Sequence, residues 1–402
     1  MLMLRALRRR PVALLWAGQA LSAIGDEIFR VALIWLAVGL IGADAGYIGA
    51  AQSAALLLLS LFGGRWADRW DHRRTMIAVD SARGLIVLLP VLAFRAGAVS
   101  LPLLVFVALT LSALSAFFDP ALQAYLPAVS GDAQTLEAAN GLMSTIARLA
   151  RAVGPGVVGL LSGLVPTIYF FTLDALSFGA SALSVAAARP ERPADIPAGA
   201  DSVEPDRLGA AWRSLRRSPL MSYLLFVKSA GGGLWALAYG LGLALLVQRL
   251  APGDVRAFGL AIASYGAGNL AGALWVGNIR RQRPAEILFG GYVWMGLGFV
   301  AMGLAPSLRA LFAACAWAGF GGPVNDLPFV DMVQRLYPVR EIPRVFRLRM
   351  AVETGAGLIL LTASPRIFRA WTPGPVIAFC GAAFVAFGAY GWARYCAVRQ
   401  AM

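Results

Sequence analysis

The chain has 402 residues, of which 59% are hydrophobic and only 14% are charged, and its mean hydropathy is +0.70. This composition excludes an ordinary water-soluble domain and indicates a membrane protein with several spans. The net charge of +14 does not indicate nucleic-acid binding, because the basic residues lie in short clusters between apolar segments rather than along one stripe.

The beginning of the chain is basic, and the apolar run that follows has no small-residue cleavage site. We therefore predict a retained first helix rather than a signal peptide that is removed. The three cysteines, Cys315, Cys380 and Cys396, lie in or at the end of apolar runs without paired or metal-ligand spacing. We expect them to be packing residues, and we expect no metal site.

Apolar runs of roughly 20 residues recur along the chain, and each is long enough to cross a bilayer as a helix. The predicted fold class is therefore an all-α membrane protein with twelve transmembrane helices. The expected spans are 12–40, 46–64, 75–95, 101–126, 140–163, 167–188, 219–248, 255–278, 284–305, 308–333, 346–365 and 374–396.

Arginines and prolines indicate the topology and the domain boundaries. Arginines concentrate in the segments that an even number of spans places on the side of the two termini, so both termini are predicted to be cytoplasmic. A polar, proline-containing linker at 189–218 separates a first half, 1–188, from a second half, 219–402. Leu126-Pro127 and Tyr337-Pro338 close corresponding spans of the two halves, a weak trace of an internal repeat.

Charged residues inside the spans are costly, about 2.5–3.5 kcal/mol each, so their positions indicate function. Asp26 lies four residues before Arg30 in the first span, which predicts that these two pair, while Glu27 is turned about 100° away. We consider Glu27 first and Asp26 second as proton-coupling residues. The alternative is a buried ion-pair cluster that holds the first helix to its neighbours.

Other spans carry single polar positions. Asp119 lies in the fourth span, Lys228 in the seventh, and Asn325 with Asp326 in the tenth. Asp80 and Arg83 fall near one end of the third span, and Asp174 of the sixth span is expected to hydrogen-bond within its own half. The candidates for substrate contact are Arg30, Asp119, Lys228, Asn325 and Asp326.

The loop at 63–74 reads GGRWADRWDHRR. Gly64, Asp68, Arg69, Arg73 and Arg74 resemble the loop between helices 2 and 3 of the major facilitator superfamily, G-x-x-x-D-R-x-G-R-R, except that Asp71 replaces a glycine and the basic pair falls one place later. This variant is similar to that of the branch containing bacterial enterobactin and multidrug exporters.

The resemblance implies two six-helix halves that rock around a central cavity lined by helices 1, 4, 7 and 10. It also implies a conformational latch in this loop, with Asp68 as its acceptor; a positive anchor at the membrane surface is the alternative. Gly154, Pro155 and Gly156 resemble the Gly-Pro motif in the fifth helix of facilitator exporters.

These observations predict a secondary transporter, a proton-coupled exporter of a siderophore-like metabolite or drug, working by alternating access. We expect a monomer in the bacterial cytoplasmic (inner) membrane, without a cofactor and driven by the proton gradient; its partners are a small-molecule substrate and the lipid bilayer. An importer or lipid flippase on the same fold is the alternative. A membrane-embedded enzyme is disfavoured by a single histidine and no metal-ligand cluster.

Overall fold

The computed structural model describes residues 6–62, 71–161, 164–189, 219–279, 283–338 and 341–400. Within these ranges all regular secondary structure is helical and no strand occurs. Eight helical stretches there have the length and apolar composition needed to cross a membrane. The all-helical, membrane-type fold is therefore confirmed, whereas the number of twelve spans stays a prediction.

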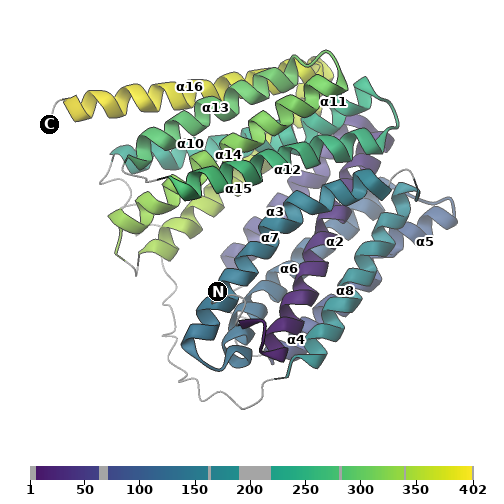
Figure 1. The fold of residues 1–402 in the computed structure, drawn as a ribbon. Helices are drawn as coiled ribbons and strands as arrows, with labels where there is room; N and C mark the ends of the chain where they lie inside the picture. Colours follow the sequence, from purple (N-terminus) through teal and green to yellow (C-terminus); the bar gives the residue numbers. More distant parts are fainter. Residues whose placement is uncertain are drawn as a thin grey trace. The chain divides into compact units, whose positions relative to one another are not determined.

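Each expected span up to residue 188 coincides with helix in the structure (Figure 1). The third is divided into two helices, and the sixth is preceded by a short 3-10 turn, η4. The elements are α2 Arg10–Ile41, η1 Gly42–Ala45, α3 Gly46–Phe62, α4 His72–Val87, α5 Leu89–Arg95, α6 Leu101–Ser130, α7 Ala133–Leu161, η4 Thr167–Tyr169 and α8 Phe170–Ala187.

The expected spans after residue 218 also coincide with helix. The first of these contains a π-helical segment, η5, which separates α10 from α11. The elements are α10 Pro219–Trp235, η5 Ala236–Gly242, α11 Leu243–Leu250, α12 Val255–Asn278, α13 Pro284–Gly303, α14 Leu308–Leu336, α15 Ile342–Ala370 and α16 Pro373–Gln400.

Helix ends follow local signals in the sequence. Asp71, Asp254 and Ser307 each accept a hydrogen bond from the backbone N–H three residues later, at the starts of α4, α12 and α14. Gly131 ends α6 in the left-handed conformation, with φ of +74°, which glycine adopts without steric cost. Polar residues that sequence reasoning assigned to loops therefore act as helix caps.

Two compact units divide the described chain. Unit 1 contains the described residues up to Leu40 and from Ala55 to Arg189, and unit 2 contains Ile41–Ala54 and the described residues from Pro219 onward. Within unit 1, α4 packs against α6 and α8. Within unit 2, α13 packs against α14 and α16, α12 against α14, and α10 against α15.

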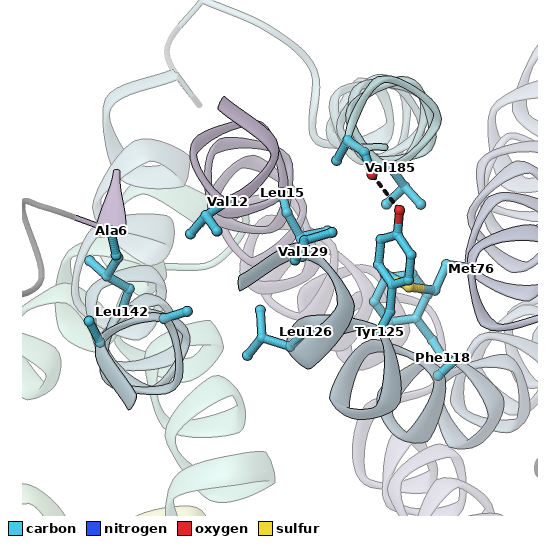
Figure 2. Packing of buried hydrophobic residues seen from close by; sticks show 14 of the residues in the cluster. Ala6, Val12, Leu15, Met76, Phe118, Tyr125, Leu126, Val129, Leu142 and Val185 are labelled. Carbon is cyan, nitrogen blue, oxygen red and sulfur yellow. Dashed lines mark hydrogen bonds between the residues drawn. The ribbon is translucent and has the colours of Figure 1, made fainter. Parts of the chain in front are cut away.

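An apolar cluster forms part of the core of unit 1 (Figure 2). It joins α2, α4, α6, α7 and α8 through side chains that include Leu15, Met76, Leu126 and Val185. The Tyr125 hydroxyl at its edge donates a hydrogen bond to the Ala188 carbonyl, just beyond the end of α8. This bond satisfies one of the carbonyls that the end of a helix leaves without an intrahelical partner.

Backbone contact between α12 and α14 holds part of unit 2. A Cβ atom on Gly268 would lie 1.9 Å from the Ala316 carbonyl oxygen, and one on Gly272 would lie 2.2 Å from that of Phe320. Glycines four residues apart leave one helix face bare, so the neighbouring backbone packs directly on it. Gly268 and Gly272 therefore mark a close contact between two helices rather than a flexible point in α12.

Candidate functional site

Two clusters of charged residues lie within the helices, one in each unit. The cluster in unit 1 contains Asp26, Glu27 and Arg30 of α2, Asp80 and Arg83 of α4, Asp119 of α6 and Asp174 of α8. The cluster in unit 2 contains Lys228 of α10, Asn325 and Asp326 of α14, and Arg349 and Glu353 of α15.

Arg30 pairs with Glu27, not with Asp26. Its Nη1 atom lies 3.0 Å from Glu27 Oε1 and 3.1 Å from Glu27 Oε2. Asp26, the expected partner, interacts with Arg30 electrostatically, whereas the close contacts of Arg30 are with Glu27. Residues three apart on a helix are neighbours just as residues four apart are, and Glu27, which is buried, reaches the exposed Arg30 from that position.

Asp80 and Arg83 form a buried pair in the interior of unit 1. Arg83 Nη1 lies 3.4 Å from Asp80 Oδ1, and the two side chains are 6% and 1% exposed, respectively. The guanidinium also lies 4.9 Å from the Phe118 ring centre and 5.4 Å from that of Phe178, which favours the cation. Sequence reasoning placed these two residues near a span end, where charges are unremarkable; the structure places them in the core.

Asp174 is fully buried on α8. The Ser177 hydroxyl donates to its Oδ1 atom over 3.2 Å, so the expected hydrogen bond within its own half is confirmed. Gly25 of α2 packs against the same group, since a Cβ atom there would lie 2.6 Å from Asp174 Oδ1. Asp26 of α2 interacts electrostatically with Asp174, so the acids of α2 and α8 face one another.

Asp119 is exposed, and its charge interacts with that of Arg83. The charge of Arg83 also interacts with that of Asp26. Asp26 interacts electrostatically with Arg30, Glu27 and Asp119 as well. The structure thus joins the sequence candidates Asp26, Asp119, Glu27 and Arg30 in one electrostatic cluster. Arg83 lies near its centre, and it was not among those candidates.

Lys228, Asn325 and Asp326 meet in unit 2, as their selection from sequence suggested. The buried Lys228 ammonium donates to Asn325 Oδ1 over 2.7 Å, to the Asn325 carbonyl over 3.2 Å and to Asp326 Oδ1 over 3.0 Å. The amide nitrogen of Asn325 donates to the Gly321 carbonyl over 2.9 Å, which turns its oxygen towards Lys228. All three ammonium protons therefore have acceptors.

Arg349 and Glu353 of α15 complete this network. Arg349 Nη2 lies 2.6 Å from Asp326 Oδ1, the oxygen that Lys228 also contacts, and Arg349 Nε lies 3.3 Å from Glu353 Oε2. Two cations and two carboxylates balance each other. Neither residue was among the candidates from the sequence, although the four-residue spacing of Arg349 and Glu353 is an ion-pair signal.

Aromatic residues lie two turns further along α10 from Lys228. The Trp235 indole donates to the Tyr265 hydroxyl over 2.9 Å, and the Tyr239 ring lies 4.9 Å from that of Trp235 and 4.2 Å from that of Tyr265. Tyr239 belongs to η5, and π-helical segments are frequent at functional sites. Unit 2 thus offers a polar and an aromatic surface on one helix.

The loop motif is only partly described. Gly64, Asp68 and Arg69 lie outside the described residues, so the latch role of Asp68 stays a prediction. Arg73 donates to the Val185 and Ala186 carbonyls at the end of α8, a favourable place for a cation. Arg74 is exposed, and its backbone N–H donates to the Asp71 carboxylate over 2.8 Å.

The Gly-Pro motif lies in α7. A Cβ atom on Gly154 would lie 2.5 Å from Glu27 Cβ, so α7 touches α2 at the predicted coupling residue. The side chain of Pro155 and the surroundings of Gly156 lie outside the described part of the chain. Among the described residues, no group of three or more His, Cys, Asp or Glu is placed to hold a metal ion.

The fold resembles that of solved transporters. A bacterial homologue of the iron transporter ferroportin, in an inward-facing state, matches with a TM-score of 0.69 over 94% of this chain and 98% of that one, at 15% identity. A POT family transporter in complex with 5-aminolevulinic acid matches with a TM-score of 0.69 over 95% of each chain, at 13% identity. These comparisons define the class as a polytopic membrane protein with a transporter fold.

Three relatives are bacterial export or transport proteins. The multidrug efflux pump Tap of Mycobacterium tuberculosis is 31% identical over 192 residues, covering 46% of this chain and 45% of the pump. The alignment therefore covers less than half the length of that relative. The staphyloferrin A transporter of Staphylococcus aureus is 24% identical over 76% of each chain, and macrolide efflux protein A of Streptococcus pyogenes is 25% identical over 86% of this chain and 87% of that protein.

Residues 3–340 match the family described as transmembrane secretion effector. The chain belongs to this family of the major facilitator superfamily, which confirms the resemblance seen in the sequence. The family and the relatives named above are transporters, not enzymes.

Proposed function

We propose that this protein is a secondary active transporter that exports small organic solutes in exchange for protons by alternating access. The observation that carries the proposal is a pair of charged networks within the helices, Glu27–Arg30 with Asp80–Arg83 in unit 1 and Lys228–Asp326 in unit 2. Charges at membrane depth are costly and mark solute or proton pathways. The efflux proteins among its relatives support export rather than import.

The unit 2 network suggests the chemistry of the solute. The carboxylates of Asp326 and Glu353 are 43% and 37% exposed, whereas the cations Lys228 and Arg349 are 5% and 16% exposed. An amine on a solute meets these carboxylates before it meets the cations. We therefore propose amphipathic weak bases or zwitterions as substrates, which includes both drugs and siderophore-like metabolites.

Apolar parts of such a solute have a complementary surface. Trp235 is 39% exposed and stacks on Tyr239, so its ring offers area for a hydrophobic or planar group. We propose that Arg30 and Asp119 contribute substrate contacts from unit 1.

Glu27 is the proposed proton-coupling residue, with Asp26 second. Protonation of Glu27 would remove the negative charge that now holds Arg30 through two contacts. A movement of the Glu27 side chain would disturb Gly154, which packs against its Cβ atom. A proton could in this way alter the contact between α2 and α7.

The remaining parts of the proposal come from the family resemblance and the charge pattern. We propose a location in the bacterial cytoplasmic membrane with both termini in the cytoplasm, two six-helix halves, and a monomer. The proposed latch comprises Gly64, Asp68, Arg69, Arg73 and Arg74, with Asp68 as its acceptor. Arg73 and Arg74 lie at the start of α4.

Inverted membrane vesicles test this function. With an acidic interior, wild-type vesicles should accumulate radiolabelled erythromycin, a macrolide, and a protonophore should abolish the accumulation. Glu27→Gln or Asp26→Asn should abolish it at equal protein level, whereas Glu286→Gln, at an ion pair near the start of α13, should not. Accumulation that needs the opposite gradient would indicate an importer, and full activity in both acid variants would reject the coupling assignment.

A further inference from the structure

Asp174 and the Asp80–Arg83 pair contain buried polar atoms without a hydrogen-bond partner among the described residues. These atoms are Asp80 Oδ2, Arg83 Nε and Asp174 Oδ2. The three residues are 1%, 5% and 0% exposed. Buried polar atoms nearly always have partners, so three such atoms in one cluster require an explanation.

Positive charge in the cluster is scarce. Arg83 alone contacts Asp80 and also interacts electrostatically with Asp26, Asp119 and Asp174. Arg30, the other described cation of this cluster, is held by both oxygens of Glu27 and also interacts electrostatically with Asp26. Two described guanidiniums thus accompany five described carboxylates, and a carboxylate that is buried and unbalanced takes up a proton.

The surroundings of Asp174 favour that outcome at its Oδ2 atom. On α8 itself, the Ser177 hydroxyl donates its hydrogen bond to Oδ1 of Asp174 and not to Oδ2. On α2, the backbone of Gly25 packs against the Asp174 carboxyl group, and Asp26 adds a second negative charge. On α4, Asp80 adds another negative charge and Arg83 a single positive one.

The remaining described neighbours do not add positive charge to Asp174. The Ser181 hydroxyl accepts a hydrogen bond from Gln19 of α2 over 2.9 Å and lies within hydrogen-bonding reach of the Asp80 carboxylate. Phe118 of α6 and Phe178 of α8 flank the Arg83 guanidinium and keep its surroundings apolar. Arg148 and Arg151 belong to α7, but their side chains lie outside the described part of the chain.

We propose that Asp174, together with Asp80 and Arg83, forms a proton-binding site in unit 1 that is distinct from the Glu27–Arg30 pair. The proton adds to Oδ2 of Asp174 and converts the carboxylate to a neutral acid. When the proton leaves, the negative charge is stabilised by Arg83, which contacts Asp80 and interacts electrostatically with Asp174. This inference rests on the proposed proton-coupled transport for its place in the cycle, but proton binding itself does not.

Infrared difference spectroscopy of the full-length protein in detergent tests the binding directly. A pH change should produce a carbonyl band of a protonated carboxylic acid, and Asp174→Asn should remove this band. Asp132→Asn is the matched control, because Asp132 is exposed and paired with Arg9, and it should leave the band unchanged. Because Glu27 and Asp26 can contribute bands of their own, the proposal is overturned if every carboxylic-acid band of the wild type is unchanged in Asp174→Asn.

A second variant covers the case in which Asp174→Asn does not fold. Ser177→Ala removes the hydroxyl that donates to Asp174 Oδ1 and keeps the carboxyl group. It should shift the frequency of the band without removing it. An unshifted band would mean that the titrating acid is not Asp174.

Transport in proteoliposomes of phosphatidylethanolamine and phosphatidylglycerol places the site in the cycle. A pH difference of about one unit supports roughly tenfold accumulation of a solute per exchanged proton. Asp174→Asn should lose this pH-driven accumulation of erythromycin but keep erythromycin counterflow, which needs no net proton movement. Retained pH-driven accumulation overturns the coupling role, whereas wild-type protein without any counterflow rejects the proposed function and leaves the infrared result to decide the site.

Discussion

Replacing Asp326 with asparagine should be among the most destabilising polar substitutions in unit 2. Lys228 and Arg349, 5% and 16% exposed, both donate to the same oxygen of Asp326. Removing one partner of a buried ion pair costs about 3–5 kcal/mol. Because Asp326 is itself 43% exposed, and because Lys228 keeps Asn325 and Arg349 keeps Glu353, we expect a value below this range, about 2 kcal/mol.

A double-mutant cycle measures the interaction itself. Lys228→Met alone should cost about 2 kcal/mol, since Asp326 keeps Arg349 as a charged donor. The double variant should cost about 2 kcal/mol less than the sum of the two single variants, as expected for residues in one charged network. The assay is reversible unfolding in mixed detergent micelles, followed by tryptophan fluorescence.

The matched control is the Asp44–Arg369 pair of the same unit, whose side chains are 34% and 64% exposed. The coupling energy of an exposed pair is about 0–1 kcal/mol, so Asp44→Asn with Arg369→Met should be nearly additive. If the free-energy costs of Lys228→Met and Asp326→Asn were also additive in the double variant, the view that Lys228 and Asp326 interact strongly would be refuted.

Two further predictions concern helix packing and a helix cap. Gly272→Ala should destabilise the protein by about 1–3 kcal/mol because its Cβ would meet the Phe320 carbonyl, whereas Gly277→Ala, in open space on the same helix, should not; equal melting temperatures for the two variants would contradict this. Hydrogen bonds from the Thr135 backbone N–H and hydroxyl lower the pKa of Asp132, so its stabilising effect is present above the unfolded pKa of about 3.9 and is lost as the pH falls below it. The stability difference between wild type and Asp132→Ala should therefore shrink between about pH 6 and pH 3, and a constant difference would exclude this origin.

Much of the helical framework could be predicted from the sequence because apolar runs report burial in lipid directly. The expected first span, 12–40, differs by two residues or fewer from α2, Arg10–Ile41. The expected fifth span, 140–163, begins seven residues too late, because α7 starts at Ala133 with the polar cap Asp132. Hydropathy detects the apolar centre of a helix, whereas its ends depend on single hydrogen bonds.

The site was harder to predict because a sequence does not show which residues of different helices meet. Lys228 and Asp326 were selected separately and do pair. Arg83 was passed over because its position seemed peripheral, yet α8 and α6 enclose it with Phe178 and Phe118. Asp71 departs from the family pattern, and only the structure shows that it caps α4.

The π-helical segment η5 changes how the seventh expected span must be read. Ala236–Gly242 forms a wider turn than the α-helix on either side, in α10 and α11. A helical wheel drawn from Pro219 to Leu250 therefore rotates out of register midway, and it assigns residues after Gly242 to the wrong face. Because a π turn absorbs one extra residue, deleting one residue from this segment would convert it to ordinary α-helix and leave the face that carries Lys228 nearly unchanged relative to Leu243–Leu250.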